Sequence, residues 1–523
     1  MGNPTDPRSR TGRAIVLATL ATAGGYGLTL IQQVVFARSM GISVETDSLA
    51  TALAWGIGTS GPVGTALASI VLPAYVGALA RQDHALARQV LRASTGIGLV
   101  AATVLMIISI VGADLLANLL APGLTQTAHE RLAGLLRISA PLQMLWIGVW
   151  LTTARANARE RYSLAAGSFA IPPIPVILTF TLIGSPSIEQ VALAYMLGAA
   201  LQVLVVSGRI GSLGELGPSF RTRTVLDLAR RLVPVGAAFG VLSVFGLAIR
   251  SVASLYGPGA VATSDYASRL VIAGEQVLLS GLLSVLFTKW SHLEGSLEAV
   301  TQAKTPSSRG RWSVQDSVLQ LLGAGTILAC LLVITARPAV AILFQGGRFD
   351  AAATIAVADF IVWMSPGIAG NMLVLLAARA LLVSGRFIIL LEIGAIAIIA
   401  MLGVGLVAGS SLGLNSVALG YSVGWVAAAG VAIRALEVDQ ALFVRQLVRA
   451  LATGGAALGS TLVVRAVLPD ASAIACVLTA LLFVGVAGLV GWRLDLTFAR
   501  DVIGALARLR STKTRAATGS RLS

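Results

Sequence analysis

Three charged side chains lie within eleven residues of an otherwise apolar part of the sequence. In the stretch SDYASRLVIAGEQ (264–276), Asp265, Arg269 and Glu275 interrupt long apolar segments. Asp265 and Arg269 are four residues apart, which places them on one face of a helix. A charge inside a membrane helix usually faces a cavity or a partner. Arg269 is therefore a candidate contact for an anionic substrate, and the alternative is a structural Asp–Arg pair near the outer membrane surface.

Motifs of enzymes and metal sites are missing from the sequence. It contains no Gly-x-Ser-x-Gly, no P-loop, no His-Glu-x-x-His and no pair of carboxylates with a recognisable helix spacing in an apolar run. The three histidines are scattered over predicted loops, and Cys330 and Cys476 lie in separate apolar runs, where packing thiols are expected. We therefore expect no enzyme activity, no metal site and no cofactor, except for a coupling cation of unknown identity.

The elements that position these charges are predicted to be membrane helices. Only 12% of the 523 residues are charged, 56% are hydrophobic and the mean hydropathy is +0.86. Apolar stretches of about 20 residues, long enough to cross a bilayer as helices, recur along the whole chain. Fourteen spans are predicted, at 14–36, 48–76, 91–113, 133–153, 163–183, 189–207, 232–253, 266–288, 317–344, 352–378, 387–408, 415–433, 447–468 and 472–492. Pro62 is expected to break the second span and Pro366 to bend the tenth.

The basic residues are distributed unequally between the two predicted sides. With a cytoplasmic N-terminus, eight of the 38 Lys and Arg fall toward the outer side: Arg38, Arg131, Arg137, Arg250, Arg269, Arg337, Arg348 and Arg465. The other 30 lie in or beside the cytoplasmic connections and tails, as the positive-inside rule requires. Topology therefore explains the net charge of +15. Both termini are predicted to be cytoplasmic, and no nucleic-acid partner is expected.

The sequence also contains an internal repeat. The segment 113–155 resembles 336–379, with Pro141 matching Pro366, and an even number of spans separates the copies. This pattern predicts two six-helix lobes in parallel orientation, a common plan of transporters. The predicted organisation is a cytoplasmic tail (1–13), a first lobe (14–210), a linker (211–231), a second lobe (232–434), two further helices (447–492) and a basic cytoplasmic tail (493–523).

Three segments resemble one transporter family. FARSMGISVETDSLATAL (36–53) resembles the first-to-second helix signature of the MurJ/MviN lipid II flippases, SDYASRL (264–270) their eighth helix, and LFQGGRFDAAAT (343–354) the loop after their ninth helix. In the last segment, Arg348 and Asp350 are interpreted as turn residues beside glycines that allow a tight backbone. All three lie in the family's order, and the resemblance covers nearly the whole chain.

The resemblance implies a fold, a substrate and a location. The fold is that of the MOP superfamily, which includes the MATE exporters: all-α, with 14 transmembrane helices in two lobes plus two C-terminal helices that form a groove for a lipid tail. The implied activity is transport of an undecaprenyl-pyrophosphate-linked cell-wall precursor from the inner to the outer leaflet of a bacterial plasma membrane, by alternating access through a cationic cavity. Expected partners are this lipid-linked glycan, membrane lipid and wall-synthesis enzymes.

The family pattern also suggests site residues and departures from it. Arg269 corresponds to the cavity arginine of the eighth helix, whereas Arg250 has no family counterpart and either enters the cavity or snorkels to the interface. Arg38 and Asp47 match family positions, and Asp47 is either the N-cap of the second helix or, with Asp265 and Glu275, a gating or ion-pair residue.

Cavity arginines of the family are replaced in the first lobe. Tyr26, Gln32 and Ser60 occupy those positions. Such polar side chains can bind a sugar or phosphate, or they can join helices to one another. The missing arginines favour an alternative cargo, another lipid-linked oligosaccharide of the O-antigen or exopolysaccharide type. A second alternative is a transport-inactive scaffold for wall-synthesis enzymes.

Overall fold

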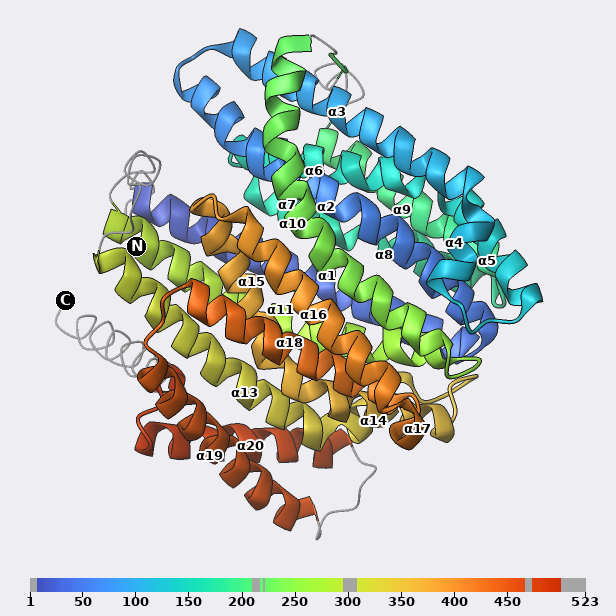
Figure 1. Cartoon of the computed structure of the whole chain (residues 1–523), viewed down its shortest axis with the longest axis vertical. Helices are drawn as coiled ribbons and strands as arrows, with labels where there is room; N and C mark the ends of the chain where they lie inside the picture. The colour runs from blue at the N-terminus through green and yellow to red at the C-terminus, as the bar shows by residue number, and fades with distance from the viewer. Residues whose placement is uncertain (1–6, 209–216, 220–221, 295–307, 466–472, 500–523) are drawn as a thin grey trace, which may run out of the picture. The chain divides into compact units, whose positions relative to one another are not determined.

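The described chain is built from helices. The computed structural model describes residues 7–208, 217–219, 222–294, 308–465 and 473–499, and Figure 1 shows these ranges as helical ribbons. Within them the only β feature is an isolated bridge between Gly346 and Phe349. The all-α class predicted from the sequence is thus confirmed.

The elements follow one another with short connections. They are α1 (Pro7–Met40), α2 (Val44–Ala80), α3 (His84–Val111), α4 (Ala113–Leu120), α5 (Gln126–Ser139), α6 (Leu142–Ala158), α7 (Tyr162–Gly167), η1 (Ser168–Ala170), α8 (Pro173–Ile183), α9 (Ile188–Ser207), α10 (Thr222–Ser254), α11 (Ala260–Glu294), α13 (Ser308–Phe344), α14 (Ala351–Met364), η3 (Ser365–Gly367), α15 (Ile368–Val383), α16 (Phe387–Val407), α17 (Gly409–Leu412), α18 (Asn415–Ala435), α19 (Gln440–Arg465) and α20 (Ala473–Arg493). Each of the fourteen predicted spans overlaps one or more of these helices.

Long apolar helices identify a membrane protein. Ten described helices are long and apolar enough to cross a membrane, and an eleventh span is added if α5 and α6, which meet at a 42° bend, are taken together. On α3, the exposed side chains at the spacing of one helix face are Val100, Val104, Ile107 and Val111. An exposed apolar stripe of this kind suits lipid and not water. The count of fourteen spans stays a prediction.

The two prolines expected to disturb helices behave differently. α2 continues through Pro62 as one helix. The prediction of a break there is wrong, because a proline removes only one backbone hydrogen bond and neighbouring groups can compensate for it. At Pro366 the expected bend is present: α14 ends at Met364, and the 3₁₀ turn η3 separates it from α15.

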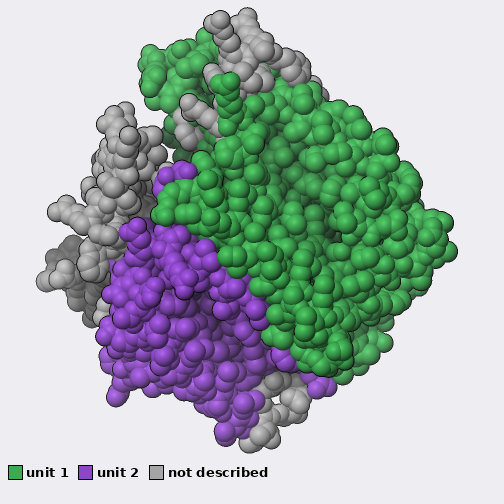
Figure 2. All heavy atoms as spheres, viewed as in Figure 1, with its two compact units in different colours: residues 1–269, 343–357, 386–420 green, residues 270–342, 358–385, 421–523 purple. Residues whose placement is uncertain are grey.

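The chain forms two compact units, each described here by itself (Figure 2). Unit 1 comprises Met1–Arg269, Leu343–Val357 and Arg386–Gly420, and unit 2 comprises Leu270–Ile342, Ala358–Gly385 and Tyr421–Ser523. These units are defined by contacts, and the two predicted lobes with their linker stay a prediction. The predicted linker lies partly outside the described residues, as does most of the basic tail.

Unit 1 is organised around α2. This helix packs against α3, α5, α6 and α10, and α10 in turn packs against α16. Part of the core consists of Leu67 from α2, Ala102 from α3, and Ile147 and Leu151 from α6. α2 and α10 are therefore held against each other along their length, which positions the site described below.

In unit 2, α13 packs against the last two helices. Ile334 of α13, Ala457 of α19 and the Phe483 ring of α20 share one buried cluster, and α19 and α20 lie side by side (Figure 1). Cys330 of α13 is a free thiol against Gly454 of α19, consistent with its predicted packing role.

Glycines allow α15 and α18 to approach closely within unit 2. A Cβ added at Gly370 would lie 2.6 Å from the Trp425 carbonyl oxygen, and the next nearest atoms are also backbone atoms of α18. A Cβ at Gly430, on α18 itself, would meet no atom within 4 Å. Small residues at such contacts are typical of membrane helix packing, because they let backbones come together.

These two glycines provide a matched test of the packing. Gly370→Ala is expected to lower the melting temperature of the full chain in detergent, because backbone cannot move away as a flexible side chain can. Gly430→Ala is expected to leave it unchanged or to raise it, since Ala is about 1 kcal/mol better than Gly inside a helix. Equal effects of the two substitutions, measured by thermal unfolding, would contradict the close approach.

Candidate functional site

One buried carboxylate joins two arginines in unit 1. Asp265, 7% exposed, lies in the first turns of α11. Its Oδ2 accepts a hydrogen bond from Arg269 Nε at 2.6 Å, four residues along the same helix. Its Oδ1 accepts from Arg250 Nη2, near the end of α10. Both carboxylate oxygens are therefore occupied by guanidinium groups, and the cluster carries one positive charge in excess.

α10 has a local reason to hold Arg250 in this position. Arg250 Nη1 donates to the Gly246 carbonyl oxygen at 2.9 Å, one turn earlier on the same helix. A Cβ at Gly246 would lie 3.7 Å from that nitrogen, so the glycine leaves space for the side chain to fold back. The snorkelling alternative for Arg250 is therefore not what the structure contains, because its guanidinium lies against α11 instead of extending to an interface.

The two arginines line a hollow of about 260 Å³. Its other walls come from small and apolar residues of α2 and α10. The complete lining is Ala50, Leu53, Ala54, Ile57, Gly58, Leu242, Ser243, Gly246, Leu247, Arg250 and Arg269. The side chains of Arg250 and Arg269 are 21% and 33% exposed, so both guanidinium groups are partly accessible. A cationic end in an apolar hollow is suited to an anion, because charge interactions are strong where water is scarce.

The sequence pattern did not identify the wall of this hollow. Leu242, Ser243, Gly246 and Leu247 lie in the apolar stretch of α10, and nothing in their types distinguishes them from residues that face lipid. Only the packing of α10 against α2 separates the two groups. The two cations, in contrast, were found from the sequence because charges are rare in such stretches.

Asp47 caps α11 instead of its own helix. Its two carboxylate oxygens accept hydrogen bonds from the backbone N–H groups of Gly259 and Ala262, both at 2.6 Å, and its side chain is fully buried. A carboxylate at a helix N-terminus satisfies free N–H groups and complements the helix dipole. The prediction that Asp47 is the N-cap of the second helix is wrong. Ser43 has that role and forms a capping box with Thr46.

An aromatic cluster holds the same end of α11. The Tyr266 ring lies 5.6 Å from both the Phe344 and Phe349 rings and 6.1 Å from the Phe36 ring, measured between centroids. The Tyr266 hydroxyl donates to the Gly41 carbonyl oxygen at 3.2 Å. The three segments that carry the recognised sequence signatures therefore meet in one place.

The turn after α13 completes this end. Gly346 and Gly347 have φ angles of +138° and +58°, which confirms the predicted tight turn. Asp350 caps α14 by accepting from the Ala353 N–H at 2.7 Å. The Arg348 N–H donates to the Arg38 carbonyl oxygen at 2.8 Å, so this turn is fastened to the end of α1.

The other predicted site residues do not line the hollow. Arg38 is exposed at the end of α1, beside Gly346. Tyr26 is 39% exposed, Gln32 is buried and donates to the Tyr195 hydroxyl, and Ser60 is buried and donates to the Gly56 carbonyl oxygen of its own helix. The last two contacts are of the kind that joins helices or satisfies backbone. A substrate role for these four residues stays a prediction.

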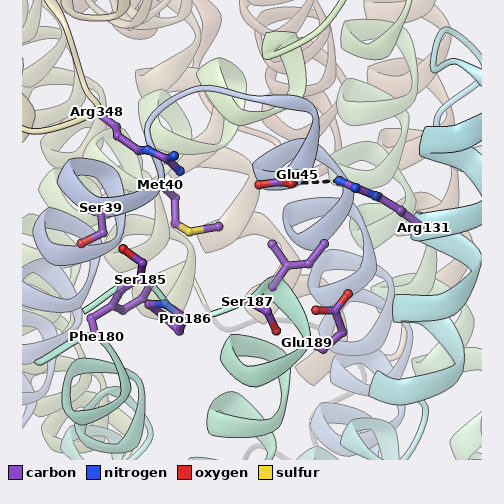
Figure 3. Close-up of a pocket in the computed structure, with 11 residues that line it drawn as sticks. Ser39, Met40, Glu45, Arg131, Phe180, Ser185, Pro186, Ser187, Glu189 and Arg348 are labelled. Carbon is purple, nitrogen blue, oxygen red and sulfur yellow. Dashed lines mark hydrogen bonds and ion pairs between the residues drawn. The ribbon is translucent and has the colours of Figure 1, made fainter. Parts of the chain in front are cut away.

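A second hollow of about 330 Å³ lies at the junction of α1, α2, α5 and α9 (Figure 3). Its lining carries both signs of charge, with Glu45 and Glu189 on one side of the count and Arg131 and Arg348 on the other. Glu45 and Arg131 form an ion pair at 2.9 Å, drawn as a dashed line in Figure 3. Both partners are about half exposed, so this pair contributes little to stability.

Comparisons with known proteins agree with the resemblance seen in the sequence. A family model described as lipid II flippase MurJ matches residues 63–486. A solved structure of lipid II flippase MurJ in an inward closed conformation superposes with a TM-score of 0.74 at 16% identity, covering 93% of this chain and 100% of that one. No curated protein matches the chain.

More distant solved structures have the same fold. An outward-facing multidrug resistance MATE family transporter has a TM-score of 0.59 at 14% identity, covering 81% of this chain and 94% of its own. A MOP superfamily transporter from Pyrococcus furiosus has a TM-score of 0.59 at 14% identity, covering 82% and 96%. At these identities the likeness shows the fold alone.

Capping by Asp47 predicts a difference between two aspartates. Asp47→Ala would leave two buried N–H groups of α11 without partners, at about 1–3 kcal/mol each. Asp83 caps α3 through the Leu86 N–H at 2.9 Å but is exposed, so in Asp83→Ala water can replace the carboxylate. Thermal unfolding of the full chain is expected to show the larger loss for Asp47→Ala. Similar losses would argue against a buried cap.

Proposed function

The chain belongs to the MurJ lipid II flippase family, and on that premise we propose that it moves an undecaprenyl-pyrophosphate-linked cell-wall precursor, lipid II or a close analogue, from the cytoplasmic to the outer leaflet. The family is one of membrane transport proteins, not enzymes. In this proposal the protein lies in a bacterial plasma membrane with both termini in the cytoplasm.

The observation that carries the proposal is the cationic hollow between α2 and α10. A pyrophosphate must leave water to cross the membrane, and fixed guanidinium groups can replace part of its hydration. Arg269 uses Nε to hold Asp265, and its two terminal nitrogens lie outside that bond. Asp265 supports the site by holding two like charges together, which would otherwise repel each other.

Alternating access is the proposed mechanism. The Asp47 cap and the Tyr266 cluster fasten the start of α11 to the ends of α1 and α2. These contacts are few and polar, so they are suited to form and break during a transport cycle. We propose that they close the outer end when the hollow is open to the cytoplasm.

A lipid tail needs a separate apolar surface, and α19 and α20 are proposed to supply it. Their exposed side chains include Leu451, Leu462 and Val463 on α19 and Leu481 and Leu489 on α20. An apolar face of this kind can accompany a polyprenyl chain that stays in the bilayer while its headgroup crosses.

A second candidate substrate has specific support. Tyr26, Gln32 and Ser60 stand where the family has arginines, so the described hollow is lined by only two cations. Fewer cations suit a headgroup with less negative charge or with more sugar contacts. Another lipid-linked oligosaccharide is therefore the alternative cargo.

Substitution of the two arginines tests the site. Arg269→Ala and Arg269→Lys are both expected to lower transport about 10-fold or more, since hydrogen bonds to charged groups contribute about 1.5–3 kcal/mol and lysine lacks the planar fork. Arg250→Ala is expected to act in the same direction. Arg137→Ala, which removes an exposed arginine paired with Asp114, is the control, and expression and thermal unfolding verify that each variant folds. Full transport by both Arg269 variants would refute the site.

The cargo is tested in cells. A bacterium depleted of its own lipid II flippase is supplied with this chain, and lipid II accessible at the outer leaflet is measured. Restored accessibility is expected. Its absence, with export of another lipid-linked glycan restored, would favour the alternative cargo. Failure of both would argue against transport and for a scaffold role.

A further inference from the structure

Glu275 is a buried acid with one free oxygen in unit 2. It lies on α11 and is 1% exposed. Its Oε2 accepts a hydrogen bond from Asn371 Nδ2 of α15 at 2.8 Å, and among the described residues its Oε1 has no hydrogen-bond partner. The Tyr421 hydroxyl of α18 lies near both Glu275 and Asn371. The flippase proposal assigns no task to this group.

The surroundings of Glu275 are neutral. α15 presents Asn371, α18 presents Tyr421, and α13 presents Leu328 beside Gly274. Within the described ranges none of the ion pairs includes Glu275, and the Tyr421 hydroxyl is the titratable group beside it. A buried carboxylate without a cation costs several kcal/mol, whereas one unpaired hydroxyl of a neutral acid costs about 1–3 kcal/mol. The neutral, protonated acid is therefore the form that fits this site.

The same contacts disfavour a metal ion. Hard cations are held by several oxygen ligands, but the partner of the Glu275 carboxyl is an N–H donor from Asn371. No group of three or more His, Cys, Asp or Glu able to hold a metal occurs in the described part of the chain. The ligand that this site suits is a proton.

The position of Glu275 connects it to the cationic hollow through one helix. Arg269 and Glu275 are six residues apart, and at 3.6 residues per turn they point to different faces of α11. One face carries an arginine of the hollow, and the other carries the acid against α15 and α18. A change of charge at Glu275 therefore acts on the helix that positions Arg269.

Asn371 lies just after the break in the α14–α15 segment. At this break, the Gly367 N–H donates to Ser422 Oγ at 3.1 Å, and Ser422 Oγ donates to the Trp363 carbonyl oxygen at 2.7 Å. Helices bend most readily where their backbone bonds are already replaced by side-chain contacts. The packing around Glu275 thus contains an element that can change shape when the acid ionises.

We propose that Glu275 is a proton-binding site and that the proton is the coupling ion of transport, a step that rests on the proposed flippase function. Glu275 carries the proton while it is packed against Asn371. When the site opens to water, the O–H bond breaks, its electron pair stays on the carboxylate and the proton passes to water.

Infrared spectroscopy tests the proton site without any transport. The full chain in liposomes at neutral pH is expected to show a protonated-carboxyl stretch that is lost in Glu275→Gln and kept in Glu45→Gln, the control acid, which is exposed and paired with Arg131. Asn371→Leu is expected to shift the band, because it removes the hydrogen bond, and it serves if Glu275→Gln does not fold. A band unchanged in both variants, no such band in the wild type, or a band that sodium abolishes relative to choline would overturn the proposal.

Reconstituted flipping tests the coupling. Proteoliposomes with labelled lipid II are given a pH gradient while valinomycin and potassium clamp the membrane potential. The wild type and Glu45→Gln are expected to change flipping rate several-fold with the gradient, and Glu275→Gln is expected not to respond. Flipping by the wild type that ignores the gradient would refute proton coupling and leave the flippase proposal standing. Absence of flipping in the wild type would refute the flippase proposal, while the infrared result still decides whether Glu275 binds a proton.

Discussion

The cost of placing a charge inside an apolar protein is the constraint on which the rest of this structure depends. Removing a charged group from water costs several kcal/mol even after the protein relaxes, so each buried charge needs a partner or must be neutralised. Asp265 meets this requirement with Arg250 and Arg269, which occupy its two oxygens. The price for that stability is that the start of α11 and the end of α10 must stay together, and this determines where the cationic hollow lies.

Two other buried acids meet the same requirement in different ways. Asp47 has no arginine and instead accepts two backbone N–H groups at the N-terminus of α11, where the helix dipole is positive. Glu275 has one amide and no cation, and neutralisation by a proton is the remaining solution. All three acids bind or belong to α11. This helix therefore contains the fixed charge, the cap and the proposed titratable group, and it is the element through which ligand binding and ion movement can influence each other.

The sequence was a good guide where residue type alone carries the information. Arg269, Asp265 and Arg250 were singled out because charges are rare in apolar stretches, and the structure brings these three together. Asp47 was singled out too, but with the wrong helix: its spacing from Ser43 and Thr46 could not show that α11 begins beside it. Pro62 likewise has the type that breaks helices, yet the packing of α2 against its neighbours keeps that helix continuous.

By itself, the sequence determined that the chain crosses a membrane many times as helices, which side carries the basic loops, and which family signatures occur in which order. These properties follow from hydropathy and composition, which act locally. Only the tertiary structure decided that Gly246 and Leu242 face a hollow while Val104 on α3 is exposed, that Gln32 bonds to Tyr195, and that Glu275 has a single partner. In apolar helices the types of residue that face lipid, protein and cavity are the same, so the packing of one helix on another is what distinguishes them.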